Sequence, residues 1–127
     1  MDSIVIMSMD NKEIEKIYMQ WKDVGEKIYF SEKEFNMHIP DGNIYISLWE
    51  DALEFYEEDD LKKIDLKDIN IEDINFIGVD YSNKDAAMSF MEKTVFSEHC
   101  YFDNDCGWIL PLDQLRSNLR EFVYMTL

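Results

Sequence analysis

The sequence predicts an α+β fold, in which a mostly antiparallel sheet of about six short strands carries three helices packed on it. Short runs of alternating apolar and polar residues follow one another between residues 27 and 49, as in strands joined by tight turns. A helical pattern precedes them, and near residue 82 a strand passes directly into a capped helix. With 127 residues, 46% of them hydrophobic and 14% aromatic, residues 1–127 are expected to form one domain with a packed core.

The first elements are a strand and an amphipathic helix. Residues 4–7 are apolar and mostly β-branched, which is typical of a strand. Asp10 and Glu13 have the spacing of a capping box, so a helix is expected behind them, ending near Gly25. Its apolar face repeats with helical spacing at Ile14, Ile17, Tyr18 and Trp21.

Three strands are expected next, over residues 27–31, 34–39 and 43–49. The last two are joined by a turn that contains Pro40 and Gly42. In the third strand the side chains alternate between two faces. It should bury Ile44, Ile46 and Leu48 and direct Tyr45, Ser47 and Trp49 to the outer face.

Residues 50–73 are the most acidic stretch, with eleven carboxylates and three lysines, which gives half of the net charge of −16. Residues 50–57 should form one or two helical turns, and residues 58–60 a loop. From residue 61 to 74 the spacing fits both a strand pair and an irregular loop, and we predict a loop with short extended pieces. Its isoleucines should pack on the domain, namely Ile64, Ile69, Ile71 and Ile74.

The remaining elements are a strand over residues 75–81, a helix capped within residues 82–85 that ends near Thr94, a hairpin and a last helix. The hairpin strands are residues 99–102 and 108–110, around an Asx-rich turn. Pro111 suits the first turn of the last helix, and the apolar chain end should be docked. The helix has an apolar stripe at Leu112, Leu115, Leu119, Phe122 and Val123.

The composition argues against two classes of partner. Affinity for nucleic acid comes from lysine and arginine, and an anionic membrane surface would repel a chain of charge −16. No secretory signal is found, and no apolar run approaches the ~18–20 residues that span a bilayer, so we expect a cytoplasmic protein.

The sequence predicts no catalytic residue, no metal site and no cofactor, and therefore no enzyme. Residues 103–107 resemble the start of a calcium loop, but Gly107 stands at loop position five, which needs an oxygen ligand, and Gln114 at position twelve, which needs Glu, so a plain turn is favoured. His99 and Cys100 are adjacent, which directs them to opposite faces of a strand. Cys106 lies among carboxylates, which disfavour a thiolate. With 28 acids, carboxylate pairs occur at any spacing and carry no information.

An exposed aromatic residue beside carboxylates is typical of a protein interface. Trp49 fits this description if it lies on the outer face of its strand, although burial under a helix is the alternative. We therefore predict a partner-binding surface composed of Tyr45, Trp49, Glu50, Asp51, Glu54, Glu57, Glu58, Asp59 and Asp60.

In size, acidity and the mixture of acids in residues 50–73 with Tyr45, Trp49 and Tyr56, the chain resembles the small acidic immunity proteins of bacterial toxin–immunity systems. The resemblance is to this class as a whole and involves no specific motif. It implies an inhibitor that neutralises a cognate toxin, often a nuclease, by direct binding through a basic surface of the toxin. Two alternatives have a similar composition: an inhibitor that mimics the charge of nucleic acid, and an adaptor subunit. A small enzyme with a carboxylate site is less favoured.

Overall fold

The computed structural model describes residues 2–24, 26–31, 33–62, 64, 71–105 and 108–124, and for residues 26–29 it describes the backbone only. Four of the predictions lie outside these residues. They concern the helix end at Gly25, the packing of Ile69, the environment of Cys106, and the docking of the chain end at residues 125–127.

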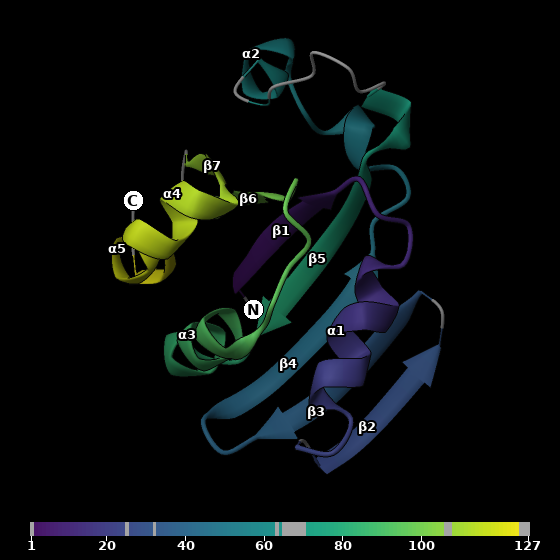
Figure 1. Ribbon diagram of the computed structural model, residues 1–127, viewed down its shortest axis with the longest axis vertical. Coiled ribbons are helices and arrows are strands. Elements are labelled where there is room, and N and C mark those ends of the chain that lie inside the picture. Colours follow the sequence, from purple (N-terminus) through teal and green to yellow (C-terminus); the bar gives the residue numbers. More distant parts are fainter. Residues whose placement is uncertain are drawn as a thin grey trace.

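The described strands form one antiparallel sheet of seven strands in the order β2-β3-β4-β5-β1-β6-β7 (Figure 1). The predicted α+β class with a mostly antiparallel sheet is confirmed, with one strand more than the six expected. β1 lies near the middle of the sheet, between β5 and β6. The bounds are β1 Asp2–Ser8, β2 Glu26–Ser31, β3 Glu34–Ile39, β4 Gly42–Leu48, β5 Asn75–Tyr81, β6 Tyr101–Asp103 and β7 Ile109–Pro111.

Five α-helices and two 3-10 helices accompany the sheet in the described residues, where three helices were expected. They are α1 Glu13–Trp21, η1 Ala52–Glu54, α2 Glu58–Leu61, η2 Ile71–Asp73, α3 Lys84–Lys93, α4 Leu112–Ser117 and α5 Leu119–Tyr124. The predicted last helix is broken into α4 and α5 at Asn118, whose φ of −129° is not helical. The Asn118 side chain donates to the Gln114 carbonyl instead, and such local hydrogen bonds compete with helix continuation.

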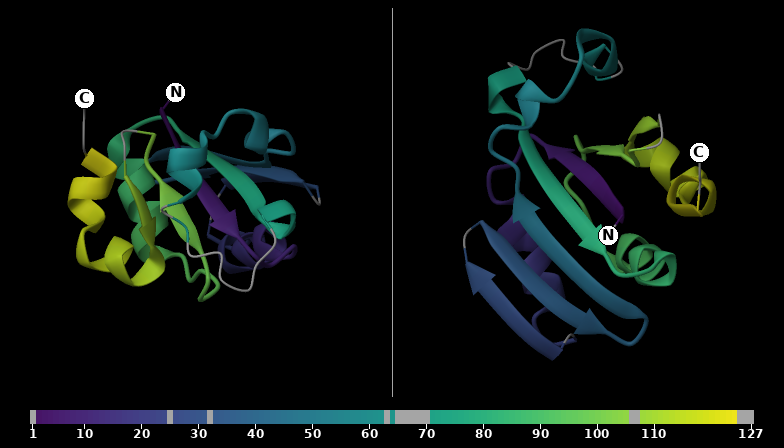
Figure 2. Two further views of the ribbon diagram at one scale, coloured as in Figure 1. Left: turned by 90° about the horizontal axis from the view of Figure 1, so that it is seen from above. Right: turned by 180° about the vertical axis from the view of Figure 1, so that it is seen from behind.

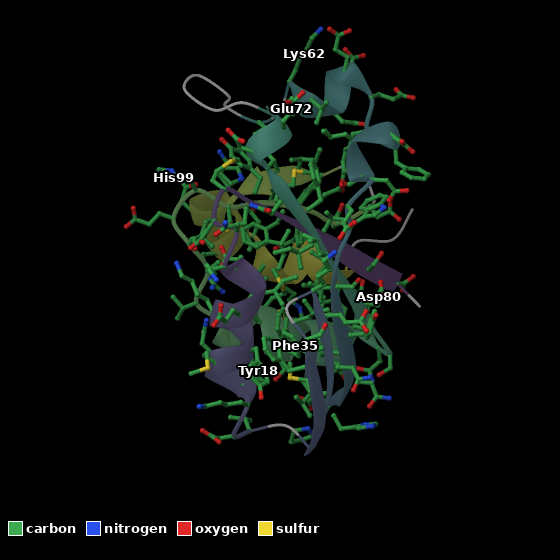
Figure 3. The ribbon with its side chains drawn as sticks, turned by 90° about the vertical axis from the view of Figure 1, so that its right-hand side faces the viewer. Tyr18, Phe35, Lys62, Glu72, Asp80 and His99 are labelled. Carbon is green, nitrogen blue, oxygen red and sulfur yellow. The ribbon has the colours of Figure 1, made fainter. Side chains whose placement is uncertain are left out.

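Helices α1, α3, α4 and α5 pack on one face of the sheet, which we call the helical face (Figures 1 and 2). Alternate strand residues point into this core, and Ile44 and Ile46 are buried there as predicted. Tyr18 of α1 meets Phe35 of β3 with ring centroids 5.6 Å apart (Figure 3). The fully buried aromatic residues of this core are Phe35, Phe90, Phe102 and Phe122.

The opposite side, the second face, has a smaller core at one end. Val5, Met7, Phe76 and Ile109 of the sheet are buried there with Ala52, Ile64 and Ile74. The rest of this face carries polar residues, including exposed Asn36 and His38. Asp80 also projects from this side, away from α1 (Figure 3).

The capping box predicted before α1 is wrong, whereas the cap predicted before α3 is confirmed. Glu13 does not form a capping box with Asp10, because its side chain turns into the core, where its Oε1 accepts hydrogen bonds from Ser8 Oγ at 2.7 Å and Cys100 Sγ at 3.2 Å. Asp10 accepts the Lys12 N–H at 2.8 Å. By contrast, Asn83 caps α3, since its Oδ1 accepts the Ala86 N–H at 2.9 Å.

The described helices are all too short or too polar to cross a bilayer.

Candidate protein-binding surface

The described part of the acidic stretch, together with Ile74 directly after it, lies against one end of the second face (Figure 2). We call these residues, 50–62, 64 and 71–74, the acidic cover. At its start the Trp49 N–H donates to the Phe76 carbonyl at 2.8 Å, which extends the pairing of β4 with β5. Further along, Ala52, Ile64 and Ile74 are buried, so the chain is fastened to the sheet at intervals. The helical turn predicted within residues 50–57 is confirmed as η1, whereas the loop predicted at residues 58–60 is wrong, because these residues begin α2. Where extended pieces were expected further along, residues 71–73 form η2.

An aromatic cluster lies where the acidic cover meets β4. The Trp49 ring centroid is 5.3 Å from that of Phe55 and 6.0 Å from that of Tyr56. Tyr56 in turn packs on Phe76 at 5.3 Å. Trp49 is half-buried by these contacts, which lies between the two predicted alternatives, whereas 66% of the Phe55 surface is exposed. A large apolar side chain this exposed, next to carboxylates, is typical of an interface.

Tyr56 connects the acidic cover to β6. Its hydroxyl donates to Asp103 Oδ2 at 2.7 Å. Burial raises the pKa of Tyr56, as does its hydrogen bond to Asp103. Burial also raises the pKa of Asp103, against the hydrogen bonds from Tyr56 and from the Asp105 N–H, and the charges of Asp105 and Asp60 raise it further. Asp60 and Asp105 therefore lie close enough to Asp103 to repel its carboxylate.

The structure separates one predicted site residue, Tyr45, from the other eight. Tyr45 lies away from the aromatic cluster and donates to Glu34 Oε2 at 2.7 Å, which raises the pKa of the tyrosine. Trp49 and Asp60 border the same recess beneath the acidic cover. The carboxylates of the cover are mostly exposed, namely Glu50, Asp51, Glu54, Glu57, Glu58 and Asp59.

Only some of these exposed carboxylates have a cationic partner in the described part of the chain. Glu50 pairs with Lys33 at 2.6 Å and Asp59 with Lys62 at 3.5 Å. Asp51, Glu54 and Glu58 take part in none of the ion pairs between described residues.

Sequence reasoning missed Phe55, Asp103 and Asp105 as site residues. Asp103 stands directly opposite Val5 in the pairing of β6 with β1, and this places it on the second face beneath the acidic cover. The Asx-rich turn at residues 103–107 was the available signal, but its position beside residues 49–60 depends on the strand order.

The other polar candidates do not form a metal centre or a nucleophile within the described residues. There, no three His, Cys, Asp or Glu side chains are placed to hold a metal ion. Cys100 carries a free, buried thiol, and burial together with the Glu13 charge raises the pKa of Cys100 to about 12. This thiol is therefore protonated near neutral pH and poorly suited to nucleophilic attack.

A wide depression of about 770 Å³ lies among the loops that precede α1, β5 and β6. Its lining is polar and includes Asp10, Glu72, Asp73, Glu98 and His99. Asp10 is already paired with Lys16 of α1. The depression differs from the recess beneath the acidic cover in having no Trp, Tyr or Phe among its described lining residues.

Comparisons of the chain with protein-family models, with curated proteins and with solved structures found no match.

Proposed function

We propose that this protein is an acidic inhibitor that binds a basic protein partner through the acidic cover and the aromatic cluster beside it. The specific form we favour is an immunity protein that neutralises a cognate toxin by direct binding. The observation that carries the proposal is an acidic segment fastened to a sheet by its own small core, with Trp49 and Phe55 at its border.

Fixed positions distinguish this surface from a flexible acidic tail. Ala52 is fully buried and Ile64 is 4% exposed, so the carboxylates between them are attached to a backbone held at both sides. A surface that is ordered before binding loses less conformational entropy on association. The same rigidity lets the charges match a particular arrangement of lysine and arginine.

The charge pattern favours a basic partner. Asp51, Glu54 and Glu58 are exposed, and no ion pair between described residues neutralises their charge. Such a field attracts a cationic surface and can raise association rates to ~10⁸–10⁹ M⁻¹s⁻¹ at low salt. The enzymes that act on nucleic acids carry cationic clefts of this kind, which agrees with a nuclease toxin as the partner.

The proposal is tested with two charge-reversal variants. The first changes Asp51, Glu54 and Glu58 of the acidic cover to lysine. The matched control changes Asp23, Glu92 and Glu121 to lysine; these are one aspartate and two glutamates, exposed after α1, in α3 and in α5, respectively. Both variants shift the net charge equally, so a difference between them reports the location of the charge.

Each tagged protein is used to capture partners from cells of its source, and the affinity of the captured partner is measured at several salt concentrations. We expect a basic protein that binds the wild type and the control. It should bind the cover variant about tenfold or more weakly and with a smaller salt dependence. Equal affinity of the partner for both variants would show that the acidic cover is not part of the binding surface.

A growth assay tests the inhibitor role separately. The captured partner, produced alone, should arrest cell growth, and co-production of the wild-type chain should restore it while the cover variant should not. A nucleic-acid-binding partner that is harmless to cells would favour the alternative of charge mimicry. A partner that remains fully active in the complex would favour an adaptor.

A further inference from the structure

A pocket of about 320 Å³ opens between the acidic cover and the second face, and we call it the cover pocket. It differs from the surrounding acidic surface in combining aromatic rings with carboxylates around one concave space. Those side chains come from four separate parts of the chain: the position directly after β4, the acidic cover, β6 and the turn after β6. They are Trp49, Phe55, Tyr56, Asp60, Asp103 and Asp105.

Aromatic rings form part of the wall. The Phe55 ring is tilted by 35° to the Trp49 ring, and the Tyr56 ring is tilted by 54° to it. Neither pair is stacked in parallel, and all three rings line the recess. The face of an aromatic ring is electron-rich and attracts a cation placed above it, most strongly for tryptophan.

The carboxylates of the pocket are held in position from within the chain. Asp103 accepts the Tyr56 hydroxyl on Oδ2 at 2.7 Å and the Asp105 N–H on Oδ1 at 2.8 Å. The second bond fixes Asp105 in a left-handed backbone conformation with φ of 60°, which aspartate tolerates. Asp60 Oδ2 accepts the Glu57 N–H at 3.4 Å at the start of α2. A carboxylate has about four lone-pair positions, so each can accept further bonds.

Negative charge in the pocket is not balanced by the described residues. The ion pairs between described residues include none of Asp60, Asp103 and Asp105. Asp103 is half-buried and Asp60 is half-buried beside it, so their repulsion is less screened than on an open surface. A cation that entered the recess would relieve this repulsion.

We propose that the cover pocket receives one arginine side chain of the partner. This inference rests on the proposed function, because it names the group of the basic partner that the surface recognises. A guanidinium is planar and weakly hydrated, stacks on aromatic faces and donates paired hydrogen bonds to carboxylates. Arginine uses the rings and the acids of the pocket together, whereas the compact lysine ammonium ion gains less from the rings.

A small probe tests the pocket without the partner. The ¹⁵N-labelled protein is titrated with the peptide acetyl-Gly-Arg-Gly-amide, and the shifts of the Trp49 indole N–H and the Asp105 amide are followed by NMR. The peptide with citrulline in place of arginine has nearly the same shape but no charge. The peptide with lysine has the charge but no planar guanidinium group. We expect saturable shifts with arginine, binding at least tenfold weaker with citrulline, and intermediate binding with lysine.

Two pocket variants and one control complete the test. Phe55→Ala removes a ring that is 66% exposed, and Asp105→Asn keeps a residue type that tolerates a positive φ, so both variants should fold. Each should weaken arginine binding about threefold or more. The control Asp23→Asn removes one exposed carboxylate in the turn after α1 and should leave binding unchanged.

Several results would overturn the inference. One is equal binding of the arginine and citrulline peptides, and another is unchanged affinity in Phe55→Ala. Shifts spread over the whole acidic surface would indicate charge attraction without a pocket, and calcium ions that saturate the same signals at lower concentration would indicate a metal site. If the peptide fails but the partner still distinguishes the two charge-reversal variants, the proposed function stands and the pocket does not. If the peptide binds but no basic partner is captured, the arginine-binding pocket stands and the proposed function does not.

Discussion

The two faces of the sheet are covered by different kinds of structure. On the helical face, α1, α3, α4 and α5 close over a large core in which Phe35, Phe90, Phe102 and Phe122 are fully buried. On the second face only one end is covered, by a segment whose helices have three or four residues each. The first arrangement uses its aromatic residues for stability, whereas the second leaves Phe55 largely exposed.

This difference separates the part of the chain that holds the fold from the part available for recognition. The acidic cover contributes few buried residues, so it can change in sequence at little cost to the sheet.

The largest difference in the free energy of unfolding is expected when a phenylalanine is changed to alanine on each of the two faces. Phe102→Ala removes a fully buried ring that packs edge-on against Phe96 at 4.9 Å, and it should lower the free energy of unfolding by about 3–5 kcal/mol. Phe55→Ala should change it by less than about 0.5 kcal/mol, because that ring is mostly in solvent. Urea denaturation of both variants measures this. Similar losses would show that the two faces carry the fold equally.

Ile64→Ala should weaken the acidic cover more than the sheet. Ile64 is 4% exposed and is one of the few buried residues of the cover, so its truncation should cost about 2 kcal/mol. Hydrogen exchange should accelerate in residues 52–62 while the amides of β3 and β4 keep their protection. Equal acceleration in both regions would mean that cover and sheet unfold as one unit.

A smaller effect is expected for Tyr56→Phe, which leaves the half-buried Asp103 carboxylate without its hydroxyl donor. The loss should be about 1–2 kcal/mol. Tyr45→Phe is the matched control, because it removes a similar bond to Glu34 on the open part of the face, and it should cost at most about 0.5 kcal/mol. Thermal unfolding of both variants compares them, and a larger loss for Tyr45→Phe would contradict the packing described.

The smallest effect concerns pH. Burial first, then the charges of Asp105 and Asp60, raise the pKa of Asp103 above its usual 3.8. Ionised Asp103 therefore reduces stability above its raised pKa, and this penalty disappears as the pH falls through that pKa toward 3.8. The stability of Asp103→Asn relative to wild type should accordingly decrease between pH 7 and pH 4 in denaturation experiments. A flat difference would show that Asp103 has the same pKa in the folded and unfolded states.

Local patterns predicted much of the sheet. The alternation in residues 34–39 and 43–49 corresponds to β3 and β4, and the strand at residues 75–81 is β5 with the same bounds. A helix cap was predicted within residues 82–85, and Asn83 provides it. These features are decided by interactions between near neighbours in the chain.

Other features depend on residues far apart in the sequence. Glu13 turned into the core because Ser8 and Cys100 both donate to it there, and Cys100 is far along the chain. The cover pocket likewise needs β6 beside β1, since only that order brings Asp103 under Tyr56. Hydrophobic periodicity gives the face of each strand but does not specify its neighbours.

The position of β1 has a consequence for the order in which the chain can fold. β1 precedes all other strands, yet its partners are β5 and β6, which begin at Asn75 and Tyr101. During synthesis β2, β3 and β4 can pair as they emerge, while β1 must wait until most of the chain has been made. Its apolar residues Ile4 to Met7 remain without a sheet partner for that time, and the carboxylates of residues 50–73 are then already present to keep the nascent chain from associating with its neighbours.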